Sequence, residues 1–314
     1  VTGFALPAPN AFIPDDVSLV KTSWEYSYLP VLLLEQDRQS IWFGQDDEFK
    51  VPKGGIFVNF RSPLVAAGPR ETAQASMFVS LLKDELNEFT YPALLAGLGF
   101  SFYAQPWGIS MRITGYNDKQ NVLLQELLGP MRSPALDRQR FEDIRDRKVR
   151  GLQNRVASRP SGQAMARLNE ALLHKQWSDE EMIAAYQTMS IKDVQAFVEQ
   201  FWAEASAEVM VYGNYQPEIV GELSNHLGEL VGARHAGDKE PGVGNAPHSR
   251  HDDSPAWRAP AGNRVTRIPA RSDLLLPMEI EHDDSVVAWY MQASGISWKD
   301  RAMAALSAQI MKSE

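Results

Sequence analysis

Short runs of β-branched and aromatic residues mark the first half of the chain and predict a sheet. Residues 40–43 and 55–60 are bounded by Asp-Asp and Pro-Lys-Gly sequences that favour turns, so we expect them to form a pair of strands. Similar runs predict three further strands at 100–104, 109–115 and 207–212.

Between the runs at 55–60 and 100–104, the apolar residues have the spacing of a helix. From Glu71 onward, apolar residues recur at i, i+3, i+4, i+8 and i+11, which is the spacing of one stripe along a helix. The stripe consists of Phe78, Leu81, Leu82, Leu86 and Phe89. Pro92 is expected to end or kink this helix because proline lacks an N–H donor.

Between residues 122 and 231 the patterns are mostly helical. Ser178 followed by Glu181 matches the capping box that begins a helix. Two helices rich in charge are expected to face solvent, at 137–158 and 160–174. The other predicted helices lie at 122–131, 190–204 and 217–231. Groups of strands and helices in this order indicate an α+β fold.

Residues 233–263 differ in composition from the rest. They are rich in Gly, Pro, Ala, Ser and charged residues, and Val243 and Trp257 are their only large apolar side chains, so we expect a linker without a core of its own. Beyond it we expect a second, smaller unit. Its predicted strands lie at 264–268, 274–280 and 286–291, followed by a helix at 298–311.

Charge and composition narrow the classes of function. The 31 Lys and Arg residues against 40 Asp and Glu residues leave a net charge of −9, so no nucleic-acid partner is expected. The absence of cysteine excludes disulfides, thiolate metal sites and Cys nucleophiles. The most apolar run, 29–34, is far shorter than the about 20 residues that cross a bilayer, so no membrane span is expected.

Histidines are the remaining candidate metal ligands, and none forms an H-E-x-x-H or H-x-x-E-H motif. One cluster, His248, His251, Asp252 and Asp253, has ligand-type side chains, but Arg250 lies among them and the segment belongs to the linker. We interpret it as a solvated linker in preference to a metal site.

Two further groups of residues could carry chemistry. Asp84, Glu85 and Glu88 put carboxylates on the long helix, where a solvated face explains them better than acid–base catalysis. Aromatic side chains could line a peptide groove, although packing in a sheet core is the favoured interpretation. They are Trp42, Phe43, Phe57, Phe60, Phe100, Phe102, Tyr103 and Trp107. The residues alone therefore identify no catalytic constellation.

Five segments taken together resemble one family. They are residues 6–16 (LPAPNAFIPDD), 41–49 (IWFGQDDEF), 82–88 (LKDELNE), 115–120 (GYNDKQ) and 212–214 (YGN). Their order and spacing are similar to those of the third domain of large insulinase/pitrilysin-family zinc metalloproteases.

The resemblance implies an enzyme of four homologous, processing-peptidase-like α+β units, each with an antiparallel-rich sheet packed by helices. Two halves would enclose a chamber for small unfolded peptides. Zn²⁺ is expected in the N-terminal catalytic half of the same polypeptide, on a helix bearing H-x-x-E-H. The counterpart here, residues 77–82 (MFVSLL), has no His. The resemblance therefore implies no catalytic, cofactor-binding or metal-binding residue in this chain.

The same resemblance divides the chain. Residues 1–20, rich in proline, would be an incoming connector, 21–232 the inactive third domain, 233–263 the linker, and 264–314 a truncated start of the fourth domain. Because the fourth unit of the family continues further and the first residue is Val1, we expect a fragment made by design or by proteolysis.

Three hypotheses follow. The preferred one is a noncatalytic piece of an insulinase-like metalloendopeptidase that forms part of the chamber wall and contacts the catalytic half and peptide substrates. The second is a stand-alone inactive binding or scaffold module. The third is a hydrolase that uses His248 and His251 as metal ligands. The cellular compartment stays open, since relatives of this kind occur in the bacterial periplasm and in the cytoplasm.

Overall fold

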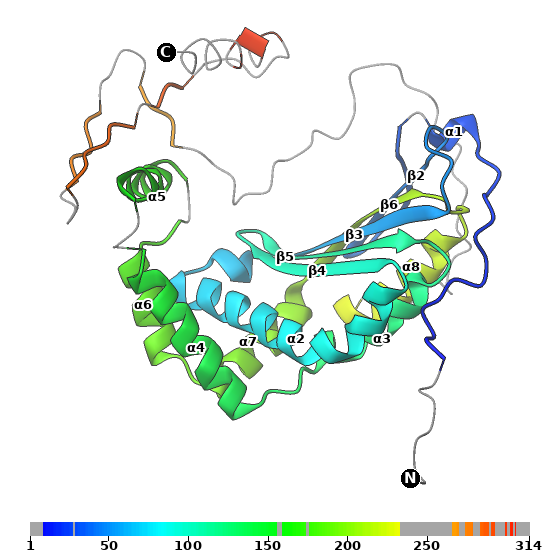
Figure 1. Cartoon of the computed structure of the whole chain (residues 1–314), viewed down its shortest axis with the longest axis horizontal. Helices are drawn as coiled ribbons and strands as arrows, with labels where there is room; N and C mark the ends of the chain where they lie inside the picture. The colour runs from blue at the N-terminus through cyan, green and yellow to red at the C-terminus, as the bar shows by residue number, and fades with distance from the viewer. Residues whose placement is uncertain are drawn as a thin grey trace, which may run out of the picture.

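The structure is a computed structural model, and it describes most of the first 232 residues. The described ranges are 9–27, 29–155, 159–173 and 176–232, followed by short stretches at 266–269, 274–278, 283–288, 290–292, 299, 302–303 and 305. Within the long ranges a twisted sheet carries a layer of helices on one face (Figure 1).

Six strands form a mixed, mostly antiparallel sheet with the order β1-β2-β6-β3-β5-β4. The parallel contact is between β2 and β6. The strands are β1 (Val31–Gln36), β2 (Gln39–Gln45), β3 (Lys53–Arg61), β4 (Leu98–Gln105), β5 (Gly108–Tyr116) and β6 (Ser206–Gly213). The architecture is therefore α+β, as the sequence predicts.

The predicted pairing of the first two strand-like runs is wrong. These runs form β2 and β3, but β6 lies between them and pairs with both. Val209 of β6 is in register with Ile41 on one side and Val58 on the other, and all three side chains are buried. β6 thus continues the buried apolar row from β2 to β3.

The helices match the predicted periodic segments. A short 3₁₀ helix, η1 (Pro63–Ala66), precedes the longest helix, α2. The α-helices are α1 (Trp24–Ser27), α2 (Pro69–Leu95), α3 (Gln120–Arg132), α4 (Arg138–Gln153), α5 (Pro160–Leu172), α6 (Asp179–Thr188), α7 (Ile191–Glu204) and α8 (Ile219–Val231). α2 continues past Pro92. None of the helices in the described part is long and apolar enough to cross a membrane.

One hydrophobic core lies between the sheet and the helices, and its members run from Phe12 to Val231. Trp202 of α7 packs in this core. The centres of its ring and of the Phe60 ring of β3 lie 5.0 Å apart in an edge-on arrangement, and its Nε1 donates to the Met131 carbonyl at 2.8 Å. α4 also contributes Phe141, so this helix is not the fully solvated one that its charge predicts.

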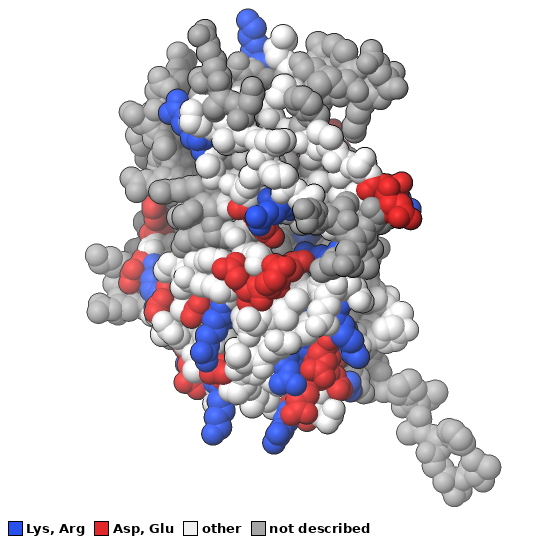
Figure 2. All heavy atoms as spheres, turned by 90° about the vertical axis from the view of Figure 1, so that its left-hand side faces the viewer, with Lys and Arg blue, Asp and Glu red and all other residues white. Residues whose placement is uncertain are grey.

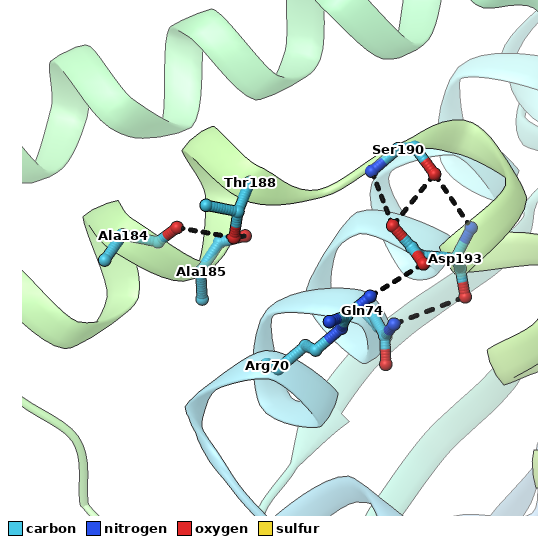
Figure 3. Close-up of polar contacts among 7 residues, drawn as sticks. All are labelled: Arg70, Gln74, Ala184, Ala185, Thr188, Ser190 and Asp193. Atoms are coloured by element: carbon cyan, nitrogen blue, oxygen red, sulfur yellow. Dashed lines mark hydrogen bonds and ion pairs between the residues drawn. The ribbon is translucent and has the colours of Figure 1, made fainter.

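Polar contacts tie the start of α2 to the start of α7 (Figure 3). Arg70 of α2 donates to the Asp193 carboxylate at 2.7 Å, and Gln74 donates to the Asp193 carbonyl at 3.3 Å. Ser190 caps α7 by accepting from the Asp193 N–H, while the Asp193 carboxylate accepts from the Ser190 N–H. The predicted capping box at Ser178 is likewise present.

Residues 15–20 lie against the loops at one end of the sheet. Asn214, in the loop after β6, accepts from the Val20 N–H at 2.8 Å and donates to the Ser18 carbonyl at 2.9 Å. It also donates to Asn117 at 3.1 Å. Two segments that carry the family resemblance, 115–120 and 212–214, thus hold the incoming chain in place.

The three strands expected beyond residue 264 are not found among the described residues of those ranges. Instead, the Gln292 side chain accepts from the Ile268 N–H at 2.8 Å and donates to the Thr266 carbonyl at 3.1 Å. Pro277, which lacks an N–H, interrupts the second range. The linker cluster that begins at His248 lies outside the described residues.

Candidate functional site

One face of the sheet lacks a covering layer of described helices, and it is the candidate site. Along each strand alternate side chains point to opposite faces. Ile56, Val58 and Phe60 of β3 are buried toward the helices, whereas Phe57 and Asn59 point the other way and are partly exposed. We call the second face the open face; it corresponds to the upper side of the sheet in Figure 1.

An apolar row crosses the middle of the open face. The register places Leu32, Trp42, Met210 and Phe57 side by side on β1, β2, β6 and β3. Arg112 of β5 follows, with its guanidinium 5.2 Å from the centre of the Phe57 ring. Phe57 is 36% exposed. The row therefore ends in a cation–π contact, and the Phe57 ring stays partly accessible.

Beside the apolar row, two glycines leave space for aromatic rings to pack against the sheet. A Cβ on Gly44 would come within 2.9 Å of the Tyr212 ring, and one on Gly55 within 2.7 Å of the Phe57 ring. These rings therefore occupy the space that side chains at the two glycines would fill. The result is a shallow surface with partly exposed aromatic faces.

A polar row follows on the other side of the apolar one. The Ser110 hydroxyl donates to Asn59 at 2.8 Å, and Arg61 pairs with Glu208 at 3.3 Å. Both members of the ion pair keep about a third of their side-chain surface exposed. Apolar and polar side chains thus lie in neighbouring rows of the open face.

The structure divides the predicted aromatic positions between the two faces. Phe43, Phe60 and Phe102 are buried on the helix side, as the core interpretation requires. Phe100 packs against the same core. Trp42, Phe57 and Tyr103 belong instead to the open face by their register. Trp107 lies in the turn between β4 and β5.

The carboxylates on α2 have structural partners. Asp84 lies 3.5 Å from Arg140 of α4, and Glu85 accepts from the Ala135 N–H at 2.9 Å. The Glu88 side chain lies outside the described part. Asp84 and Glu85 are therefore explained by contacts that hold α2 against α4 and the segment before it.

The residues on α2 do not suit a zinc ion. At the counterpart of the expected zinc helix, Met77, Phe78, Leu81 and Leu82 are buried apolar side chains. Elsewhere in the described ranges, no three His, Asp or Glu side chains gather as metal ligands would. His226 contacts Gln125 at 3.2 Å on the surface between α3 and α8.

Sequence reasoning missed Leu32, Met210 and Arg112, because their place on the open face depends on register between distant strands. Alternation within β6 was the available signal. Val209 and Val211 face the core, so Met210 and Tyr212 must face away from it.

Comparison with known proteins agrees with the resemblance. A family model described as the middle or third domain of peptidase M16 matches residues 2–185. Human insulin-degrading enzyme is 32% identical over 211 residues, which are 67% of this chain and 21% of that protein. A putative zinc protease of Schizosaccharomyces pombe, mug138, is 30% identical over 231 residues, covering 72% of this chain and 23% of its own length.

The fold agrees as well. The crystal structure of pitrilysin superimposes with a TM-score of 0.68 at 22% identity, covering 73% of this chain and 24% of that one. The chain therefore spans about a fifth to a quarter of the relatives it matches. By the family model and these relatives, the chain belongs to the peptidase M16 (insulinase/pitrilysin) family and corresponds to its middle or third domain.

Proposed function

We propose that this chain is a noncatalytic part of an insulinase-type zinc metalloendopeptidase, in which it forms part of the wall of a peptide-enclosing chamber and contacts the catalytic half. Residues 21–232 would be the domain proper and 1–20 its connector. Residues 233–263 would link it to the start of the next unit at 264–314. Zn²⁺ would belong to the N-terminal catalytic half, where it supplies an activated water.

The observation that carries the proposal is the open face of the sheet. A sheet face with Trp42, Phe57 and Tyr212 partly exposed is unusual unless it meets another surface. Its rows offer apolar contact, the Arg112 guanidinium and a partly exposed Arg61–Glu208 ion pair, which together suit peptides of varied sequence. Such a surface holds a substrate without taking part in the cleavage step.

Reconstitution tests this role. The chain and the N-terminal catalytic half of the same polypeptide are expressed separately, and cleavage of a quenched fluorogenic peptide is measured with added zinc. We expect no cleavage by the chain alone and faster cleavage by the mixture than by the catalytic half alone.

Two results would contradict the proposal. Chelator-sensitive cleavage by the chain alone would return attention to the histidines of the linker, His248 and His251. A mixture no faster than the catalytic half alone would favour a stand-alone binding or scaffold module. Zinc titration with both histidines changed to Ala separates a linker metal site from contaminating activity.

A further inference from the structure

A second feature of the molecule is a cleft where α2, α4 and α6 meet the turn between β4 and β5. These elements enclose a cleft of about 490 Å³ that is open to solvent on one side. Val65, Leu152 and Met182 contribute apolar wall. Trp177 also lines it and is held in place because its Nε1 donates to the Thr72 hydroxyl at 2.8 Å.

Lys148 of α4 supplies the charge in this cleft. Its Nζ donates to the Ser76 hydroxyl at 2.8 Å and lies 5.8 Å from the centre of the Tyr186 ring. Burial, assisted by the nearby positive charge of Lys83, lowers the pKa of Lys148 to about 8. The ammonium is thus partly desolvated and faces a hydroxyl and an aromatic ring.

No described carboxylate compensates this ammonium. Arg155, which also lines the cleft, pairs with Asp179 of α6. On α2, Lys83 repels Lys148, and on α6 burial raises the pKa of Tyr186, which keeps the phenol neutral.

Two other cations of α4 differ from Lys148 because they have carboxylate partners. Figure 2, which views the molecule from this side, shows acidic and basic side chains interspersed. Arg138 pairs with Glu142, and Arg145 with Asp146. Lys148 therefore stands out as a cation in a partly apolar recess whose hydrogen-bond partner is a neutral hydroxyl.

We propose that this cleft binds a small carboxylate with an apolar body, with the carboxylate on Lys148 Nζ and the Ser76 hydroxyl and the apolar body against Val65, Leu152 and Met182. An ammonium that has lost part of its hydration gains most from an anion that brings charge-assisted hydrogen bonds. This inference concerns a separate place on the molecule and does not depend on the role of the open face.

Calorimetric titration of the chain with hexanoate tests the site, with hexan-1-ol as the neutral analogue. We expect hexanoate to bind, hexan-1-ol to bind at least about tenfold more weakly, and Lys148→Met to weaken hexanoate to a similar degree. Lys83→Met is the matched control on α2: Lys83 is close enough to affect Lys148 but does not line the cleft, so this variant should weaken binding far less than Lys148→Met.

Protonation gives a second readout. A carboxylate beside Lys148 favours its ammonium form, so binding near pH 8 should take up protons and the measured heat should depend on the ionisation enthalpy of the buffer. Lys148→Met should abolish this dependence. A peptide compared with its carboxyl-amide shows whether a peptide terminus also occupies the site or whether the site takes free acids alone.

Two results would overturn the proposal: equal hexanoate binding by Lys148→Met and the unchanged chain, or equal binding of hexanoate and hexan-1-ol. A measurement without any variant covers the case in which Lys148→Met fails to fold. Hexanoate should protect Lys148, but not Lys83, from acylation followed by mass spectrometry. Equal labelling of Lys148 with and without hexanoate would also refute the site.

Discussion

At the scale of single residues, glycines and one buried tyrosine determine how the end of the sheet is built. Gly213, the last residue of β6, has φ +132°, and a Cβ there would lie 2.4 Å from the Gly54 Cα. At this point β3 and β6 therefore approach each other too closely for any side chain at position 213. The loop that follows carries Asn214, which hydrogen-bonds to Ser18 and Val20, and Tyr215, which is buried in the core.

Gly213→Ala should therefore destabilise the fold by about 2 kcal/mol or more, because strained backbone and a clash with backbone atoms add together. Gly221→Ala is the control: this glycine lies exposed in α8 and a Cβ there meets nothing within 4 Å. It should stabilise by about 0.5–1 kcal/mol. Urea unfolding of both variants measures the difference, and equal effects would contradict the account.

Tyr215→Phe tests a buried hydrogen bond and its pH dependence. The Tyr215 hydroxyl donates to Gln120 at 2.6 Å, so its loss should cost about 1–2 kcal/mol. Burial raises the pKa of Tyr215 far above 10.0, so the folded state keeps a proton that the unfolded state releases above about pH 10. Stability should fall as pH rises beyond 10, and less steeply in Tyr215→Phe. Parallel slopes from unfolding at pH 8 and 11 would refute this.

At the scale of elements, the junction of α2 and α7 depends on the cap of α7 (Figure 3). Ser190→Ala should cost about 1 kcal/mol because it removes the acceptor for the Asp193 N–H and loosens the carboxylate that Arg70 binds. Thr188→Ala, two residues away, removes only a hydroxyl bonded to its own helix at Ala184 and should change stability by less than about 0.5 kcal/mol. Thermal unfolding compares the two variants.

The acid dependence of this junction supplies a check. Hydrogen bonds from Ser190, first of all from its backbone N–H, and the contact with Arg70 lower the pKa of Asp193. The stability it contributes is present above its unfolded pKa and is lost as pH falls through the folded value. Ser190→Ala keeps the backbone N–H but removes the hydroxyl that donates to the Asp193 carboxylate at 2.8 Å, so its cost should shrink on acidification. An undiminished cost at pH 2 would show that the cap acts without the carboxylate.

Local sequence patterns predict where helices and strands lie, but they do not predict which strands pair with one another. The stripe from Phe78 to Leu86 identifies α2 because burial repeats with the helical period. The position of β6 between β2 and β3 depends on contacts across more than a hundred residues, which no local period encodes. β1 was missed because Val31–Gln36 is half-buried along most of its length, without alternation, and bulges between Leu32 and Leu34.

At the scale of the whole molecule, the family follows from the sequence and the candidate site does not. Segments such as 115–120, which resemble the family in sequence, make hydrogen bonds at the end of the sheet. The open face depends on which side of each strand the helices cover. Trp42 and Phe43 are neighbours of similar chemistry, yet they face opposite sides.

The central claim is that the open face contacts the enclosed peptide, and photo-crosslinking tests it most directly. Benzoylphenylalanine replaces Phe57 on the open face or Tyr91 on α2, which is 60% exposed on the helix layer. Each variant is assembled with the catalytic half, freed of zinc so that the peptide stays intact, and irradiated with labelled peptide. The account predicts crosslinks from position 57 and none above background from position 91. Crosslinks from position 91 alone, or equal crosslinking from both positions, would contradict it.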